Sequence, residues 1–592
     1  MNKFDGKKKD VIFHIIFAVS LIFLLLLPFV HINVRCIPYI FNDEFGYWAC
    51  AAKFAGLDWS DTFSKIPYYS YGYGLILSIL VRLFENMGTA YKVAIIFNGV
   101  WLALSYIFLY KSARIIFKNI SKFIILIFSF VVVLFSSNIA EINYTWPEVF
   151  LFMLFTLCFY LIVLYIEHPN RSKAALLAVI MVGTYYTHQR TLGICLAVIV
   201  LHFLLFLLKR ITWKELLCFF LTLGICFIIG NIIKADIINS IWSTSDTVSS
   251  NNFSGQASKL ATIFSAEGII KLFFSFMGKI YYVFAATFLI VPFAIYTIFD
   301  KWIFPKKKLQ FTNEFFIGIF LLLVFLFTIG INTIAMINPG NVTHIVYGRY
   351  IDNILGVYLL LGIIFIYKNG VNLKQNILFV ILFFLTSISV DNAVKYFQLK
   401  YRAAINSIGI SYIVEQDYIE IWKGLIFVLG IWFFLQIMRK ILKKRRKVLV
   451  VVISSCMILT FFMIGTNAYQ TFELDWWDAA RSSEICAEII MDLEKKNNSS
   501  IEIYAIMEES GYPLRYTGNG VQFLLKDTTV NSISVLESKG IKWSDESIII
   551  EAAGRETIQG FEIIYQDATY QLSVPQNGRL FDLAINNDFT SK

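Results

Sequence analysis

Residues 11–30 read VIFHIIFAVSLIFLLLLPFV, and after ten intervening positions residues 41–48 read FNDEFGYW. The first stretch is long enough to cross the roughly 30 Å hydrocarbon core of a bilayer as a helix. The second places two adjacent acids, Asp43 and Glu44, among aromatic residues just beyond that predicted membrane exit. A carboxylate persists in such a position only if it is solvated, paired or used. The two stretches together predict a membrane protein with a polar site near one membrane face.

The composition excludes an ordinary soluble protein. Of 592 residues, 58% are hydrophobic and only 16% are charged, and the mean hydropathy is +0.67. The formal net charge is +10, but the Lys and Arg residues cluster in short loops between apolar runs, as the positive-inside rule expects. We therefore infer no nucleic-acid partner. The sequence contains no CxxC motif or Cys/His cluster, which argues against a zinc site or a disulfide framework.

Apolar runs with basic residues at every second junction predict about thirteen membrane spans. The number of spans is thirteen to within one or two, because the fifth and eleventh runs are short. The cluster RKILKKRRK at 439–447 marks a cytoplasmic loop. An uncleaved amino-terminal anchor then starts in the cytoplasm, and the carboxyl-terminal segment ends outside a multi-pass protein of the plasma membrane. The runs are 11–30, 91–110, 123–139, 146–165, 174–186, 191–208, 216–233, 273–298, 315–336, 351–367, 377–390, 421–438 and 448–464.

Two domains are expected: a transmembrane domain at 1–466 and an extracytoplasmic domain at 467–592. The second has the composition of a soluble α/β domain, with an amphipathic helix at 479–495 and strands at 501–506, 547–550 and 561–565. In the external loop 31–90, residues 73–84 are apolar but too short to span, which predicts a surface helix. The predicted fold is therefore a polytopic α-helical membrane protein with a small extracytoplasmic C-terminal α/β domain.

Several polar residues at span ends fall on the same outer face as the acid pair. Asp43 and Glu44 lie at a predicted helix start, where negative charge is favoured, so a simple helix cap is one interpretation. A buried ion pair that holds spans together is another. A functional interpretation rests on their convergence with residues that start the fourth span, separate the fifth and sixth, and start the tenth: Glu148, His188, Arg190, Arg349 and Tyr350.

The outer-face arginines call for an anionic partner. Arginine in a span costs roughly 2.5 to 3.5 kcal/mol on insertion scales, and the positive-inside rule does not favour Arg190 or Arg349 at outer ends. An external carboxylate with nearby cations suits transfer from a lipid phosphate. In that reaction a carboxylate serves as general base for the incoming hydroxyl, and arginine stabilises the phosphate leaving group.

These motifs resemble the GT-C membrane glycosyltransferases, and most nearly the bacterial relatives of protein O-mannosyltransferases and of the aminoarabinose lipid A transferase. The resemblance implies a polyprenyl-phosphate sugar donor and an acceptor hydroxyl on a cell-envelope glycan, lipid or protein, with inversion. It implies Asp43 as base with Glu44 as its partner, and Arg190, Arg349 and Lys65 as ligands of the donor phosphate. We also expect substrate contacts from the remaining span-end residues, Glu148, His188 and Tyr350. No metal is demanded, although Asp43 could bind a divalent ion.

Other functions remain open at this point. Trp476-Trp477-Asp478 is similar to the acceptor motif of oligosaccharyltransferases, but the following Tyr-Gly of that motif is missing. A transporter or flippase for lipid-linked sugars would also need intramembrane charges, although such proteins favour midplane sites. An inactive relative that only assembles with partners is a third alternative. No Walker A, GxGxxG or GxSxG motif supports nucleotide binding or a serine nucleophile.

Overall fold

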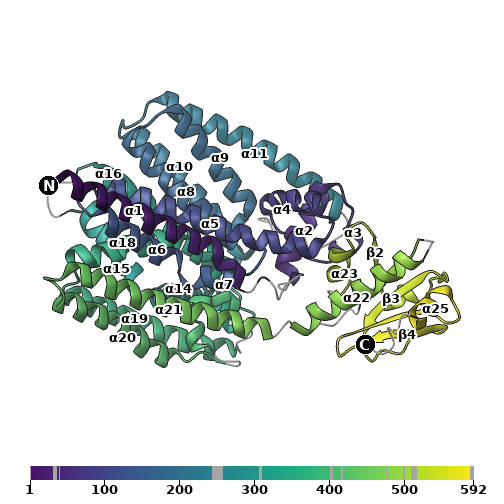
Figure 1. The fold of residues 1–592 in the computed structure, drawn as a ribbon. Helices are drawn as coiled ribbons and strands as arrows, with labels where there is room; N and C mark the ends of the chain where they lie inside the picture. The colour runs from purple at the N-terminus through teal and green to yellow at the C-terminus, as the bar shows by residue number, and fades with distance from the viewer. Residues whose placement is uncertain are drawn as a thin grey trace.

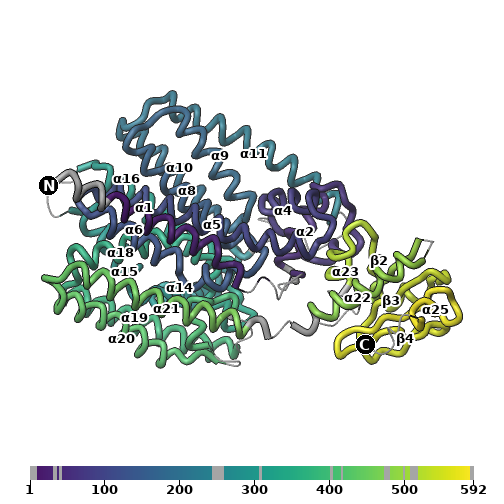
Figure 2. The backbone as a smooth tube through the Cα atoms, viewed as in Figure 1, coloured from purple at the N-terminus to yellow at the C-terminus, as the bar shows by residue number. Residues whose placement is uncertain are grey.

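The computed structural model describes most of the chain (Figures 1 and 2). The described residues are 2–30, 32, 37–38, 41–242, 258–305, 310–399, 404–414, 418–474, 477–497, 500–507 and 517–586. Trp476 of the possible acceptor motif lies outside them.

Eleven helices within these residues are long and apolar enough to cross a membrane, so the chain is a multi-pass membrane protein. The other two predicted spans are also helical, but α6 (Lys122–Val133) has 12 residues and α9 (Arg171–Thr187) has 17. The eleven are α1 (Asn2–Leu26), α5 (Met87–Ile116), α8 (Glu148–Glu167), α10 (Leu192–Leu207), α11 (Trp213–Ile241), α14 (Ala266–Ala286), α16 (Asn313–Ala335), α18 (Arg349–Asn369), α19 (Leu373–Phe397), α20 (Ile421–Ile441) and α21 (Arg446–Leu474).

One predicted span is broken. The run 273–298 folds as the end of α14 and a separate helix, α15 (Ile290–Ile298). Between them Phe288 and Leu289 have φ values of 49° and 63°, a left-handed conformation that ends a helix. Pro292 explains the position of the break, because in an uninterrupted helix its ring would clash with the carbonyl of residue 288, whereas in a first turn it is tolerated.

The two ends of the bundle differ in charge. Where α8 ends, Lys118 Nζ lies 3.0 Å from Glu167 Oε1. Where α18 ends, Arg439 donates to the carbonyl of Ile366 at 2.7 Å. The first residues of both helices are the predicted site residues Glu148 and Arg349. A 20-residue helix is about 30 Å long, so the basic loops and the predicted site lie at opposite ends of the bundle.

Three short elements cover the site end of the bundle: α2 (Phe41–Ala55), α3 (Ser60–Phe63) and α4 (Gly72–Leu83). The predicted surface helix is confirmed as α4, which packs along α2 (Figure 1). Leu75, Ile79 and Leu83 recur at every fourth position of α4 and are exposed. This apolar stripe is typical of a helix that lies in a membrane interface.

The carboxyl-terminal part contains a five-stranded sheet in its described residues, and lies beyond the α2–α4 end of the bundle (Figure 1). The strand order is β2-β1-β3-β5-β4; β1 pairs in parallel with β2 and β3, whereas β5 pairs antiparallel with β3 and β4. The predicted helix and three predicted strands are confirmed. The boundary at 466/467 stays a prediction. The elements are α22 (Trp477–Lys496), β1 (Glu502–Met507), α23 (Thr517–Leu525), β2 (Val530–Ser534), α24 (Val535–Ser538), β3 (Ser547–Ala552), β4 (Phe561–Gln566), β5 (Tyr570–Pro575) and α25 (Arg579–Asn586).

Candidate active site

Asp43 lies in the first turn of α2 and is held from two sides. Tyr69 donates a hydrogen bond to one carboxylate oxygen, and Arg349 forms an ion pair with the other. Gly46 makes the first contact possible, because a Cβ at that position would overlap the ring of Tyr69. Burial raises the pKa of the Asp43 carboxyl, but the Arg349 charge and the two hydrogen bonds lower it by more. The pKa of Asp43 is therefore lower than that of an ordinary aspartate, and the carboxyl group stays ionised to a lower pH.

Glu44 has a different set of partners from its neighbour. It is completely buried, and one of its oxygens accepts hydrogen bonds from Tyr91 Oη at 3.0 Å and from the Thr145 amide and hydroxyl at 2.5 and 2.8 Å. Thr145 also accepts a hydrogen bond from Trp48 Nε1 at 2.9 Å. These bonds tie α2 to α5 and to the segment before α8. We therefore expect Glu44 to position α2 rather than to contact the reacting atoms.

Glu148 joins the two predicted arginines. One of its oxygens accepts from Arg190 Nη1 at 3.1 Å and also pairs with Arg349, while the other lies against Arg190 Nη2. All three side chains are nearly inaccessible to solvent. Since Arg349 also pairs with Asp43, the four residues form one chain of alternating charge in the order Asp43, Arg349, Glu148, Arg190. Charges buried in this way are tolerated only when paired.

Aromatic rings cover both guanidinium groups. The Cζ atom of Arg349 lies 3.9 Å from the ring centroid of Trp146, and that of Arg190 lies 4.9 Å from the ring of Tyr350. Such cation–π contacts add attraction and limit rotation of the side chain. Arg349 is therefore held against Asp43 and Arg190 against Glu148.

The backbone that precedes α18 is fixed by two tight contacts. Lys279 donates hydrogen bonds to the carbonyls of His344 and Ile345 at 2.6 and 2.8 Å. Gly348 lies against the ring of Tyr282, which leaves no space for a Cβ. These contacts determine where α18 starts, and therefore where its first side chain, the bridging arginine, is placed.

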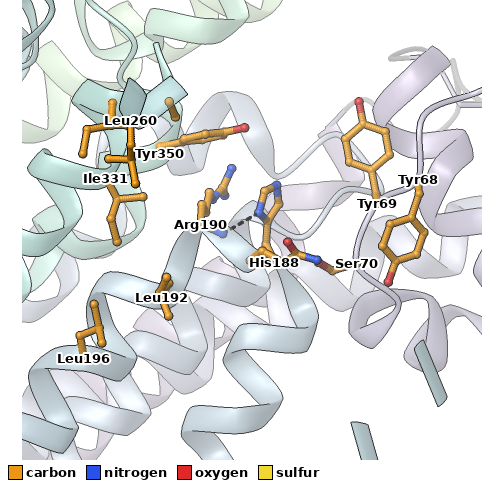
Figure 3. A pocket seen from close by; sticks show the side chains of 13 residues that line it. Tyr68, Tyr69, Ser70, His188, Arg190, Leu192, Leu196, Leu260, Ile331 and Tyr350 are labelled. Atoms are coloured by element: carbon orange, nitrogen blue, oxygen red, sulfur yellow. Dashed lines mark hydrogen bonds between the residues drawn. The ribbon is translucent and has the colours of Figure 1, made fainter. Parts of the chain in front are cut away.

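A cavity of about 240 Å³ opens beside this charged group. Figure 3 shows Tyr68 and Tyr69 on one side of Arg190 and apolar side chains on the other. Arg190 Nε is buried and has no hydrogen-bond partner among the described residues. A cavity with a cationic end and apolar walls suits a ligand with an anionic head and a hydrocarbon tail. The lining residues are Tyr68, Tyr69, Ser70, His188, Gln189, Arg190, Leu192, Leu196, Leu260, Ile331, Ile334, Ala335 and Tyr350.

His188 lies at the polar end of the cavity and is neutral at physiological pH. Its Nδ1 accepts the Arg190 amide hydrogen at 3.2 Å, as the dashed line in Figure 3 shows. Burial and the nearby Arg349 charge lower the pKa of His188 to about 3, although the Asp43 charge acts in the opposite direction. We therefore expect His188 to act as a neutral hydrogen-bonding residue, not as an acid in the pH 5 to 8 range.

The lowered pKa predicts a pH-dependent stability. The unfolded state binds a proton at His188 near pH 6.5, whereas the folded state binds it only near pH 3, so this residue makes the protein less stable as pH falls through that window. Protonation of this one residue can change the free energy of unfolding by at most about 1.4 kcal/mol per pH unit. His188→Asn, which keeps an acceptor for the Arg190 amide, should flatten the dependence of thermal unfolding on pH between 4 and 6.5. His168→Asn, at an exposed position, is the control; an unchanged slope in His188→Asn would contradict the prediction.

The structure brings together most, but not all, of the predicted residues. Lys65 is exposed and makes no contact with the charged group within the described part of the chain; its charge instead lowers the pKa of Glu537 in the carboxyl-terminal part, where hydrogen bonding from Ser534 is the larger cause. In the sequence, the run Pro67-Tyr68-Tyr69-Ser70-Tyr71 fits either a surface that stacks on sugars or, with more weight, an interfacial aromatic belt; Trp146 was not singled out. Tyr47, one helical turn after Asp43, packs against Tyr69 with ring centroids 5.5 Å apart, and sequence analysis assigned it no role.

Metal binding has limited support in the arrangement. No group of three or more His, Cys, Asp or Glu side chains that could hold an ion occurs among the residues searched, which are the described ones. Asp43 already contacts Tyr69 and Arg349 through its two oxygens. A divalent ion at Asp43 would have to displace one of these contacts, and it stays a prediction.

Comparison with known proteins identifies the fold. No protein-family model matches the sequence, and no curated protein matches it. The crystal structure of ArnT from Cupriavidus metallidurans bound to undecaprenyl phosphate aligns with 95% of this chain and 98% of its own, at 11% identity and a TM-score of 0.51. The chain has the GT-C fold. The alignment with ArnT extends over both the predicted membrane domain and the carboxyl-terminal part.

Two further GT-C structures align less closely. They are the arabinosyltransferase EmbB from Mycobacterium smegmatis, at 12% identity over 77% of this chain and 42% of that one, with a TM-score of 0.38, and the oligosaccharyltransferase from Archaeoglobus fulgidus, at 9% identity over 90% and 69%, with a TM-score of 0.42.

Proposed function

We propose that this GT-C protein is an inverting glycosyltransferase that moves a sugar from a polyprenyl-phosphate donor to an acceptor hydroxyl of a cell-envelope glycan, lipid or protein. The observation that carries the proposal is the position of Asp43. This ionised carboxylate accepts a hydrogen bond from Tyr69, which lines a cavity with apolar walls. It is also linked through Arg349 and Glu148 to Arg190 at the polar end of that cavity. The similar fold of ArnT, solved with undecaprenyl phosphate bound, supports the same ligand class.

The donor phosphate would lie at the cationic end of the cavity. Arg190 lines this end of the cavity, and its buried Nε has no hydrogen-bond partner among the described residues. A buried donor left unsatisfied costs about 1–3 kcal/mol, which a bound phosphate oxygen would recover. Tyr69, His188 and Tyr350 line the same end. The prenyl chain would follow the apolar wall between α10 and α16.

The chemical step is a single displacement. Asp43 removes the proton of the acceptor hydroxyl as its oxygen forms a bond to the anomeric carbon of the sugar. The bond from that carbon to the phosphate oxygen breaks, and its electron pair leaves with polyprenyl phosphate. Arg349 and Arg190 stabilise the negative charge on that phosphate. Attack on the face opposite the leaving group inverts the anomeric configuration.

The charge distribution supports an extracytoplasmic site. The basic loops lie at the ends of α8 and α18 that are opposite to Asp43 and its partners, and such loops favour the cytoplasm. With the amino terminus in the cytoplasm, the site and a carboxyl-terminal domain at 467–592 face the outside, and the membrane domain comprises 1–466.

The test is sugar transfer by the purified protein in lipid nanodiscs. Radiolabelled polyprenyl-phosphate sugars are supplied with envelope fractions as acceptors, and the release of polyprenyl phosphate is measured together with label in the acceptor. Transfer that requires Asp43 would support the enzyme. Movement of the labelled lipid between leaflets without sugar transfer would instead support a flippase and would reject the proposal.

The apolar wall predicts a selective effect on donor binding. Leu196 lies on α10 and lines the cavity, so Leu196→Trp should narrow the path of the prenyl chain. We expect the KM for the donor to rise by about tenfold, which corresponds to roughly 1.4 kcal/mol, with little change in kcat. Leu207→Trp, on the same helix but exposed outside the cavity, is the matched control. Equal KM values for the two variants would remove this wall from the donor site.

A further inference from the structure

Helix α23 of the carboxyl-terminal part inserts a phenylalanine into an aromatic socket next to α2. The Phe523 ring centroid lies 5.1 Å from that of Trp48, 6.2 Å from those of Phe45 and Trp59, and 6.3 Å from that of Tyr91. Phe523 is completely buried. Phe45 and Trp48 belong to α2 and Tyr91 to α5, so a single side chain from the carboxyl-terminal part packs against both helices. We call these four partner residues the aromatic socket.

Two socket residues belong to the hydrogen-bond network that holds Glu44. Tyr91 donates to Glu44, and Trp48 donates to Thr145, which itself donates to Glu44. The tilt of both rings therefore affects the network directly. Glu44 is adjacent to Asp43 in the first turn of α2, so movement of either ring would move the carboxylate proposed as base.

Polar contacts hold α23 in this place. Trp59 Nε1 donates to the carbonyl of Lys526 at 2.7 Å, and Lys526 Nζ donates to the carbonyl of Phe84 at 3.1 Å. Asn519, at the other end of the helix, donates to the carbonyl of Thr62 at 3.2 Å. These bonds join both ends of α23 to the segments around α3 and α4. They therefore hold both the orientation of α23 and the position of Phe523 in the socket.

We propose that α23 is a positioning element of the active site, and that Phe523 keeps Asp43 aligned with Arg349 and Tyr69 from about 480 positions further along the chain. The proposal rests on the function proposed above. It gives the carboxyl-terminal domain a role in the chemical step, through the orientation of α2, in addition to any contact that it makes with the acceptor.

Loss of the ring should therefore affect turnover more than donor binding. Phe523→Ala leaves a cavity in the socket, into which Trp48 and Tyr91 relax. Because a displacement of about 1 Å at a reacting group can cost roughly 100-fold in rate, we expect kcat to fall about 10- to 100-fold. The KM for the donor should change by less than about threefold, since the donor cavity has no lining residue in the socket.

The experiment combines kinetics with hydrogen–deuterium exchange on the full-length protein in nanodiscs. Phe523→Ala should speed amide exchange in residues 41–55, the α2 segment. Phe561→Ala is the matched control, because Phe561 is also a buried phenylalanine of the carboxyl-terminal part but packs against Trp543 and Ile549. Its α2 exchange and kcat should stay close to those of the wild type. Phe523→Leu, which keeps apolar volume, should fall between the wild type and the alanine variant.

The exchange rates of α2 in these variants test the positioning role of Phe523. The positioning role is overturned if Phe523→Ala keeps wild-type α2 exchange, or if Phe561→Ala raises it equally. If Phe523→Ala does not accumulate, Phe523→Leu and Phe561→Leu provide the same comparison. Exchange is measured without substrate, so a wild type that transfers no sugar would reject the proposed function while leaving the structural coupling to be judged by itself.

Discussion

Asp43→Asn is expected to lower kcat for sugar transfer by roughly 10² to 10⁴-fold, the usual contribution of a general base. Asparagine can still accept the hydrogen bond from Tyr69, but it cannot take a proton from the acceptor hydroxyl. Arg349 keeps Glu148 as an ionic partner, so the protein should remain folded. The measurement is the rate of label transfer at saturating donor, with the thermal unfolding temperature recorded for each variant.

The control for Asp43→Asn is Asp61→Asn, an exposed acid in the same external loop, which should keep wild-type activity. The lowered pKa of Asp43 adds a second check. The base is lost only when pH falls below the usual aspartate pKa, so at about pH 3.9 the wild-type rate should still exceed half of its plateau value as far as this group is concerned. Asp43→Asn with more than about a tenth of wild-type activity would exclude Asp43 as the base.

Arg349→Ala is expected to lower kcat/KM for the donor by roughly 10² to 10³-fold, the range seen when a donor to a developing anion is removed. The arginine bridges Asp43 and Glu148, so its removal also leaves the buried Glu148 carboxylate and the half-buried Asp43 carboxylate without this partner. Breaking a buried pair in this way costs about 3–5 kcal/mol. We therefore expect lower stability as well, in contrast to a residue that only contacts substrate.

A double-mutant cycle separates the two effects. Stability is measured for Arg349→Ala, Asp43→Asn and the double variant; the loss in the double variant should be smaller than the sum of the single losses, because both remove one ion pair. Arg349→Lys keeps the charge but lacks the planar fork that reaches both carboxylates, so it should recover stability more than activity. Arg171→Ala, at an exposed position on α9, is the control. Wild-type kcat/KM in Arg349→Ala would remove this arginine from the donor site.

The membrane architecture followed from the sequence because span length and apolarity are local properties. A stretch of about 20 apolar residues has to become a helix when it enters a bilayer, whatever its neighbours do. The alternation of basic loops likewise placed Asp43, Glu148, Arg190 and Arg349 at one face, and the structure does bring these four side chains into one group. Pro292 marks in the sequence the break before α15, but the hydropathy pattern predicted a single span at 273–298.

Partner choice within the site depended on tertiary structure. Adjacent residues on a helix point about 100° apart, so two neighbouring acids can have unrelated roles, and only the contacts in the folded protein show that Asp43 and Glu44 have different partners. Lys65 was predicted to belong to the site because it lies in the same external loop as Asp43, but in the structure it is exposed and outside the charged group. The strands β2 and β5 escaped sequence analysis, because short strands in a mixed sheet are defined by their pairing.

The sequence by itself determined that this chain crosses the membrane many times and concentrates polar groups at one face. Only the tertiary structure decided that Asp43 pairs with a residue 306 positions away, that Glu148 joins both arginines, and that Phe523 packs behind α2. The physical reason is the range of the interactions. Transfer of a segment into lipid depends on that segment's own side chains, whereas a buried ion pair or an aromatic socket exists only after helices distant in sequence have packed together.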